Sequence, residues 1–313
     1  MIEANETFNG TWPFEPKFHT VPATGDAASF EMHYVDEGPR DGEVLVCLHG
    51  EPTWGYLYRN MIPRLSERYR VIVPDHMGFG KTETPQDRTY TLKTHVDNFA
   101  TLVDTLDLRD ITLVIQDWGG PIGTQYTVRN ADRVKRLFYA NTVNGFGMAG
   151  RDDLPQINDS NWFRWIGGGI ENGRTEAVLR NLGSTVLSVM KIIGFENSAA
   201  VDDTWIDAYS APFTAPEECI GAHEFPLDAF LARFVEYMLE GAAGVEQLKA
   251  KPAMLAEGMC DKAIPPEIAI ADFEATWPEG VIVRLPNVGH FCQEDAPETL
   301  VSLIDAFVQT HRG

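Results

Sequence analysis

One stretch of the sequence, residues 111–129, places an aspartate where a predicted strand turns sharply into a predicted helix. Apolar, β-favouring residues predominate over residues 111–115, and a helical pattern resumes after Gly119 and Gly120, which leaves Asp117 on the turn. Such a turn holds its side chain clear of both elements and directs backbone N–H groups of the helix toward it. This position suits a carboxylate nucleophile. The alternative is an ordinary N-cap, which is the usual role of an aspartate before a helix.

Two further polar residues follow the last two predicted strands. Asp261 comes shortly after the strand at residues 253–257, and His290 follows the strand at residues 281–285. In an open α/β sheet the loops after the carboxyl ends of the strands converge on one crevice, so we expect Asp117, Asp261 and His290 to meet there. Taken singly, a loop aspartate is commonly a turn or cap residue, and a lone histidine is commonly structural.

The order nucleophile, acid, histidine along the chain is that of α/β-hydrolases. An ionised Asp117 can displace a good leaving group from an sp³ carbon and form an alkyl ester on the enzyme. His290, oriented by Asp261, can then take a proton from the water that attacks this ester. The backbone N–H groups of Glu51 and Trp118 are placed to receive the oxyanion, and the indole N–H of Trp118 can stabilise a departing halide. This chemistry requires no metal and no organic cofactor.

The elements that must position these residues are strands alternating with helices, which predict an α/β fold with a mostly parallel, eight-stranded sheet covered on both faces. We expect two antiparallel strands within residues 8–36 and further strands at residues 44–48, 70–74, 111–115, 134–141, 253–257 and 281–285. Helices are expected at residues 56–65, 91–106, 228–240, from 266, and 297–310, with a turn at residues 167–169. Residues 143–225 lack strand signals and are predicted to form a helical cap, leaving residues 1–142 and 226–313 as the core domain.

Composition limits the classes of partner. The 313 residues include 46 acidic and 25 basic side chains, and the net charge of −21 disfavours nucleic acid and anionic membranes as partners. No signal-peptide pattern and no apolar stretch of membrane-spanning length occurs, so we expect a cytoplasmic protein. The cysteines have neither zinc-site spacing nor paired histidines and are expected to be reduced thiols: Cys47, Cys219, Cys260 and Cys292.

Three short motifs carry a family resemblance: residues 49–54 (His-Gly-Glu-Pro-Thr-Trp), residues 116–120 (Gln-Asp-Trp-Gly-Gly) and residues 289–291 (Gly-His-Phe). With them the chain resembles the haloalkane dehalogenases of the α/β-hydrolase superfamily, and residues 209–213 have a counterpart in the cap of that family. The resemblance implies a small apolar halogenated substrate, with halide ion and water as the other ligands, and a monomer or small homo-oligomer. One departure is Glu51, because many members have an asparagine there that helps to hold the halide.

A halide leaving in an apolar pocket needs more than one hydrogen bond to offset its lost hydration, and an ionised Glu51 has only acceptors to offer. The second donor is therefore expected to be a cap indole. Trp162 and Trp165 lie three residues apart and share roughly one face of a helix, so either can be the donor while the other packs. The resemblance favours Trp165, whose distance before residues 209–213 better matches the cap tryptophan of the family, with Trp162 as the second choice and Trp205 as the next.

Two other functions fit parts of this pattern. An epoxide hydrolase shares the aspartate, histidine and acid, but it needs phenolic donors from the cap, for which Tyr209 is a candidate and Tyr237 a poorer one. A Trp after the nucleophile and a Trp-rich cap argue against that function, because an indole cannot supply the proton. A non-catalytic protein that binds a small ligand would have no need for all three triad residues.

Overall fold

The computed structural model describes residues 2–147 and 157–312 and contains one eight-stranded sheet in the order β1-β2-β4-β3-β5-β6-β7-β8. β1 and β2 are antiparallel to their neighbours, and the other strands are parallel. The predicted α/β fold is therefore confirmed, and the parallel strands bring their carboxyl ends to one edge. The strands are β1 (Lys17–Val21), β2 (Phe30–Glu37), β3 (Val44–Leu48), β4 (Arg70–Pro74), β5 (Ile111–Gln116), β6 (Val134–Ala140), β7 (Ala253–Gly258) and β8 (Val281–Leu285).

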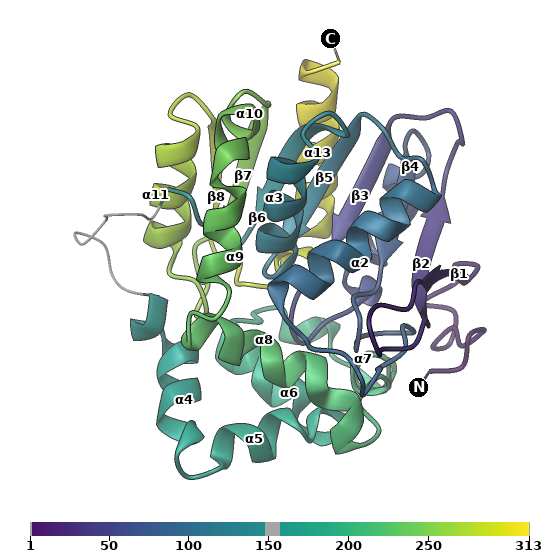
Figure 1. The fold of residues 1–313 in the computed structure, drawn as a ribbon, viewed down its shortest axis with the longest axis vertical. Helices are drawn as coiled ribbons and strands as arrows, with labels where there is room; N and C mark the ends of the chain where they lie inside the picture. Colours follow the sequence, from purple (N-terminus) through teal and green to yellow (C-terminus); the bar gives the residue numbers. More distant parts are fainter. Residues whose placement is uncertain (1, 148–156, 313) are drawn as a thin grey trace.

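Helices cover both faces of the sheet. Figure 1 shows α2 and α3 in front of the sheet and α13 behind it. Thr91 caps α2, since its Oγ1 accepts a hydrogen bond from the backbone N–H of Thr94 at 3.3 Å, and this confirms the helix start that the sequence predicted. The helices of the core are α1 (Ile62–Leu65), preceded by a 3₁₀ turn at Gly55–Tyr58, α2 (Leu92–Thr105), α3 (Gly119–Arg129), α9 (Val235–Glu240), α10 (Val245–Lys249), α11 (Pro266–Thr276), α12 (Cys292–Asp295) and α13 (Pro297–Thr310).

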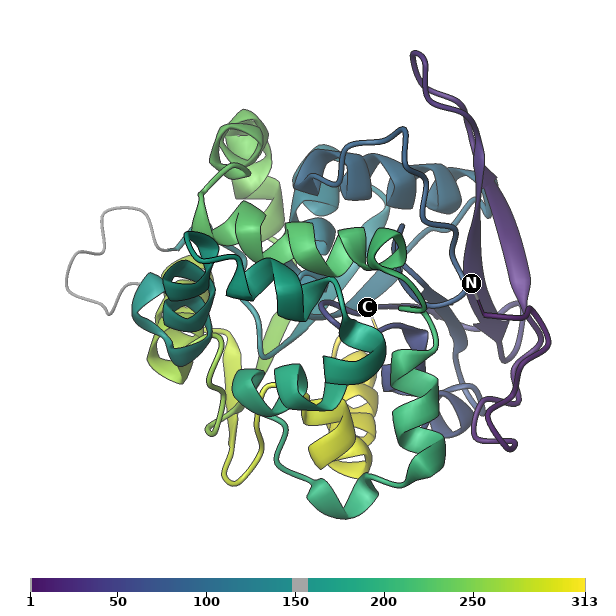
Figure 2. The same ribbon diagram turned by 90° about the horizontal axis from the view of Figure 1, so that it is seen from below.

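A layer of helices lies across the carboxyl edge of the sheet, as the views from the side and from below both show (Figures 1 and 2). This layer contains α4 (Asn161–Ile170), α5 (Arg174–Leu179), α6 (Leu182–Ile193), α7 (Asp203–Ser210) and α8 (Ile220–Phe230). It corresponds to the cap expected at residues 143–225, of which residues 148–156 lie outside the described part. Because α8 runs through residue 225, the boundary between cap and core remains a prediction.

The turn expected at residues 167–169 is wrong, because these glycines lie inside α4. A Cβ on Gly167 would lie 2.5 Å from Cζ of Phe230, and one on Gly169 would lie 2.3 Å from Oγ1 of Thr175. The glycines therefore allow α4 to pack closely against α8 and the start of α5, which outweighs their poor helix propensity.

The single helix expected at residues 228–240 is also wrong. α8 ends at Phe230, and Ala232 has a left-handed backbone with φ of 53° that separates α8 from α9. The sequence pattern gave no sign of this break because alanine is the strongest helix former.

Two simple properties complete the description of the fold. No helix within residues 2–147 and 157–312 combines the length and the apolar character that crossing a membrane requires. The four cysteines carry free thiols, and three of them are buried.

Candidate active site

Asp117 lies between β5 and α3 in a strained backbone conformation with φ of 49°. The start of α3 lies so close to β3 that a Cβ on Gly119 would be 2.3 Å from the carbonyl oxygen of Leu48, so only glycine fits in this turn. The residue that precedes α3 is Trp118, and no side chain caps this helix. Asp117 is therefore not an N-cap, and its carboxylate is free to contact other elements.

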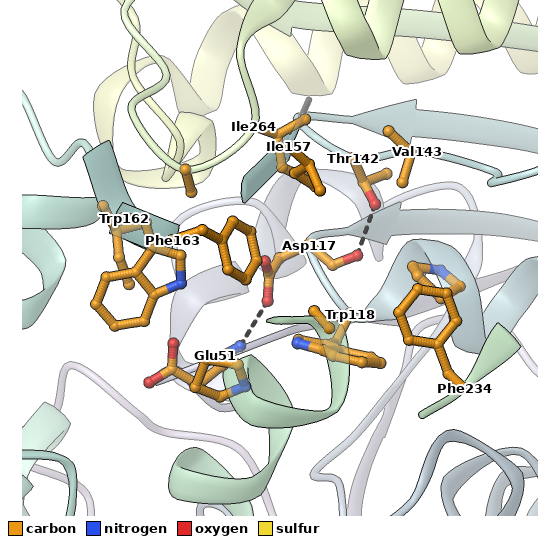
Figure 3. Close-up of a pocket in the computed structure, with 15 residues that line it drawn as sticks. Glu51, Asp117, Trp118, Thr142, Val143, Ile157, Trp162, Phe163, Phe234 and Ile264 are labelled. Atoms are coloured by element: carbon orange, nitrogen blue, oxygen red, sulfur yellow. Dashed lines mark hydrogen bonds between the residues drawn. The ribbon is translucent and has the colours of Figure 1, made fainter. Parts of the chain in front are cut away.

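Groups from three different loops hold Asp117, and Figure 3 shows two of these contacts, those with Glu51 and Thr142. Its Oδ1 accepts a 2.7 Å hydrogen bond from the backbone N–H of Glu51, and its Oδ2 lies 3.2 Å from Nε2 of His290. The Asp117 carbonyl accepts a 2.6 Å hydrogen bond from Oγ1 of Thr142. A Cβ on Gly50 would lie 1.9 Å from Oδ1, so this glycine lets the β3 loop approach the carboxylate. With Oδ1 held by Glu51, Oδ2 is the oxygen left to react.

The predicted partners Asp261 and His290 meet as a buried pair. Nδ1 of His290 lies 2.8 Å from Oδ2 of Asp261. The backbone N–H groups of Ala263 and Ile264 hold the other Asp261 oxygen at 2.8 and 3.0 Å, and the backbone N–H of His290 is held at 2.8 Å by the carbonyl of Gly194 in the cap. The fold thus brings Asp117, His290 and Asp261 together in one hydrogen-bonded line.

Asn141 is a further residue of this site, for which sequence analysis assigned no role. It directly follows β6 with φ of 45°, and its Nδ2 donates to Oδ2 of Asp261 at 2.9 Å. Its amide also exchanges hydrogen bonds with the backbone of Gly258, at 3.1 and 3.3 Å. Its place after a central parallel strand was the available signal, since the loops after those strands converge. Asn141 positions the acid that positions His290.

Two carboxylates face the two nitrogens of His290 and determine its charge. Burial by itself lowers the pKa of His290, but Asp261 and Asp117 reverse this effect and raise the pKa to about 10. With this pKa, His290 is an imidazolium at neutral pH. Any change that neutralises Asp117 removes one of the two charges that hold this proton.

Two buried glutamates lie beside the triad. Burial and the charge of Asp117 raise the pKa of Glu51 well above its usual range, and burial and Asp261 do the same for Glu257. One carboxyl oxygen of each has no hydrogen-bond partner within the described residues. The raised pKa of each side chain favours its protonated, neutral form. The expectation that Glu51 offers only acceptors applies to its ionised form. The protonated form, which burial favours, also has an O–H donor.

A mostly apolar cavity of about 80 Å³ lies between the core and the cap, beside Asp117. Its volume has room for roughly five to eight water-sized groups. The core contributes Glu51, Asp117, Trp118, Pro121, Thr142, Val143, Ala263 and Ile264, and the cap and the segment after it contribute Ile157, Trp162, Phe163, Ile193, Pro226, Ala229 and Phe234.

The two candidate cap tryptophans occupy different positions. Trp162 is only 4% exposed and lines the cavity, whereas Trp165 does not line it and stacks on Trp162 at 5.4 Å between ring centroids. Figure 3 shows the indole nitrogens of Trp118 and Trp162 directed toward the same space beside Asp117. The cavity is thus lined by Trp162, the second choice, and not by Trp165, which was the first choice. Trp205 is buried elsewhere, stacked on Phe195.

The phenols considered as proton donors lie away from the cavity. The Tyr209 hydroxyl donates to Glu294, whose carboxylate is also paired with Arg59. The ring of Tyr237 lies 3.9 Å below the guanidinium of Arg129. Neither side chain, nor any other tyrosine that the structure describes, lines the cavity.

The described residues contain no group of three or more histidine, cysteine or acidic side chains arranged to hold a metal ion. The acidic and imidazole groups of the site are instead bonded to one another and to backbone N–H groups.

Residues 43–297 match the model of the alpha/beta hydrolase fold family. A haloalkane dehalogenase of Psychrobacter cryohalolentis is 33% identical, over 94% of this chain and 92% of its own length. A cis-3-alkyl-4-alkyloxetan-2-one decarboxylase of Xanthomonas campestris is 32% identical, over 89% of this chain and 92% of its own. Among solved structures, the tetrameric haloalkane dehalogenase DpaA of Paraglaciecola agarilytica superposes with a TM-score of 0.74 at 29% identity, covering 96% of both chains.

Proposed function

The chain belongs to the α/β-hydrolase superfamily as a haloalkane dehalogenase-like member, and on this premise we propose that it hydrolyses carbon–halogen bonds of short haloalkanes. The observation that carries the proposal is the pair of indole N–H groups, from Trp118 and Trp162, beside the Asp117 carboxylate in an apolar cavity. An indole is a donor with no basic site, so it stabilises an anion without competing for protons. The small cavity supports a substrate of only a few heavy atoms.

In the first step, Oδ2 of Asp117 attacks the carbon that bears the halogen, a C–O bond forms, and the halide leaves with the electron pair of the C–X bond. The backbone N–H of Glu51 holds Oδ1 and so orients the carboxylate for this displacement. The two indoles receive the halide, whose lost hydration they partly replace.

In the second step, His290 activates water against the ester. Once Asp117 is a neutral ester, only Asp261 still supports the imidazolium, so His290 can release its proton to solvent and become a base. It then takes a proton from water, which attacks the ester carbonyl, and the backbone N–H groups of Glu51 and Trp118 stabilise the oxyanion. Collapse restores the Asp117 carboxylate and the His290 imidazolium. The balance is haloalkane plus water to alcohol, halide and one proton.

A second candidate follows from the relatives that are oxetanone decarboxylases. Such a substrate carries two alkyl chains, for which a cavity of about 80 Å³ has little room. We therefore favour dehalogenation.

The test compares three products from one preparation: bromide from 1-bromobutane, diol from 1,2-epoxybutane, and alkene from a cis-dialkyl oxetanone. Steady bromide release is the expected result. Alkene formation without bromide release would move the function to the decarboxylases. If none of the three substrates gives a product, the result would favour a protein that binds a small ligand without catalysis.

A further inference from the structure

Glu51 places a second carboxyl group next to the nucleophile, and the proposed dehalogenation does not use its side chain. The side chain lines the cavity and is 3% exposed, and its Oε1 has no hydrogen-bond partner within the described residues. Figure 3 shows this carboxyl below the Trp162 ring in that view. A buried, unpartnered acid that lines the cavity requires an explanation.

Halide is a weak base and leaves without a proton, whereas an oxygen leaving group needs an acid near it. The indoles cannot act as that acid, and the Tyr209 phenol is committed to Glu294 outside the cavity. His290 is hydrogen-bonded to Oδ2 of Asp117, at the attacking end. In an in-line displacement the departing oxygen lies on the opposite side of the carbon from Oδ2, out of reach of His290. Besides the nucleophile Asp117, Glu51 is the acidic residue that lines the cavity, and it is the group left to supply that proton.

We propose that Glu51 is a general acid and gives this site a second activity, the hydrolysis of short terminal epoxides to diols. The inference rests on the roles of Asp117 and His290 in the proposed function. It adds a class of substrates whose leaving group is an oxygen atom.

The steps balance in atoms and protons. Oδ2 of Asp117 bonds to a ring carbon, the C–O bond of the epoxide breaks, and the oxygen takes the proton of Glu51 to become a hydroxyl. One proton then passes through water from His290 to the Glu51 carboxylate, which leaves His290 as a base. It next takes a proton from the water that attacks the ester, and collapse frees the diol and the Asp117 carboxylate. Epoxide plus water gives diol, and no proton reaches the solvent, in contrast to dehalogenation.

The electrostatics of the cavity agree with this role. Burial, with the Asp117 charge as the second cause, raises the pKa of Glu51 well above its usual range, which favours the protonated form that a general acid needs. Diol formation should therefore fall with rising pH as Glu51 ionises, while halide release, which needs no acid, should not follow this loss.

The experiment uses two substrates with the same carbon skeleton, 1-bromobutane and 1,2-epoxybutane, on the full-length protein. Glu51→Gln keeps the backbone N–H and the shape of the side chain but removes the acid. We expect diol formation to fall by about 100-fold or more, and bromide release to fall far less. Tyr209→Phe is the matched control, because it removes the competing phenol and should leave diol formation intact. Glu51→Asp, which keeps a shorter acid, should restore part of the diol formation.

Each outcome decides the proposal. Bromide release without diol from the wild type would overturn the second activity and leave the proposed function standing. Neither product from the wild type would overturn both. Equal diol rates in the wild type and Glu51→Gln would remove Glu51 as the acid, and a loss confined to Tyr209→Phe would assign that role to the phenol. If Glu51→Gln fails to fold, the wild-type pH profiles decide: parallel profiles for diol and bromide contradict the proposal.

Discussion

Nε2 of His290 lies 3.2 Å from Oδ2 of Asp117, although 173 positions separate the two residues in the chain. The proposed base is thus paired with the proposed nucleophile, and the pair holds a proton that only the neutralisation of Asp117 sets free. The base is therefore held inactive until the ester that it must hydrolyse has formed. This relationship orders the two chemical steps and leads to the first two predictions.

Replacing Asp117 with alanine should abolish halide release, because no other carboxylate lies at the attacking position. The fold should persist, since one lost charged hydrogen-bonding partner costs roughly 1–3 kcal/mol. Bromide release and circular dichroism on the same sample check this. Turnover by a folded Asp117→Ala protein would rule out Asp117 as the nucleophile.

His290→Phe should release about one bromide per active site and then stop, because displacement needs no base and ester hydrolysis does. Mass spectrometry of the intact protein should show an alkyl adduct, and peptide mapping should place it on Asp117. Steady turnover, or a protein without adduct, would contradict the assigned role of His290.

Asp261→Asn should give a milder form of the same defect, because the imidazole remains while its charge partner is lost. Ester hydrolysis should slow by roughly 10²–10⁴-fold, with a smaller effect on bromide release. Rapid-quench measurement of the adduct during turnover separates the two steps. An equal loss in both steps would mean that Asp261 acts on the shape of the site rather than on His290.

Trp162→Phe should weaken bromide binding by roughly tenfold, the value of one hydrogen bond to an anion, and should slow the displacement step. Trp165→Phe, three residues away and outside the cavity lining, is the matched control and should change bromide binding little. Quenching of indole fluorescence by bromide measures both variants. The opposite pattern would return the role to Trp165, which the sequence spacing had favoured.

The stability of the protein should fall in mild acid because of His95. This side chain is buried with both ring nitrogens unpartnered within the described residues, and burial, aided by His49, lowers its pKa from 6.5 to about 3. Between these two pH values His95 is protonated in the unfolded chain but not in the folded protein. The stabilisation is therefore complete above pH 6.5 and is lost as the pH falls toward 3.

In His95→Phe the free energy of unfolding should depend less on pH between 6.5 and 3, because phenylalanine binds no proton. Urea unfolding at several pH values checks this for both proteins. A wild-type free energy of unfolding that does not change between neutral pH and pH 4 would contradict the assignment.

Local sequence patterns were sufficient for the elements that carry the triad. The strand at residues 111–115, the glycines after Asp117 and the placement of Asp261 and His290 after later strands are all short-range features. In a parallel sheet these features imply a common edge, because each strand delivers its following loop to the same side. The order of residues along the chain is therefore enough to predict the fold class and the meeting of Asp117, Asp261 and His290.

The properties of the cavity depended instead on how the cap packs. Trp162 and Trp165 share roughly one helix face, and only the packing of α4 against α8 decides which of them meets the cavity. Glu51 is an ordinary acidic residue in the sequence, and only its burial beside Asp117 raises its pKa and favours the neutral form. Residue type and spacing thus determine which groups are present, whereas desolvation and orientation, which arise only when distant segments pack together, decide what those groups do.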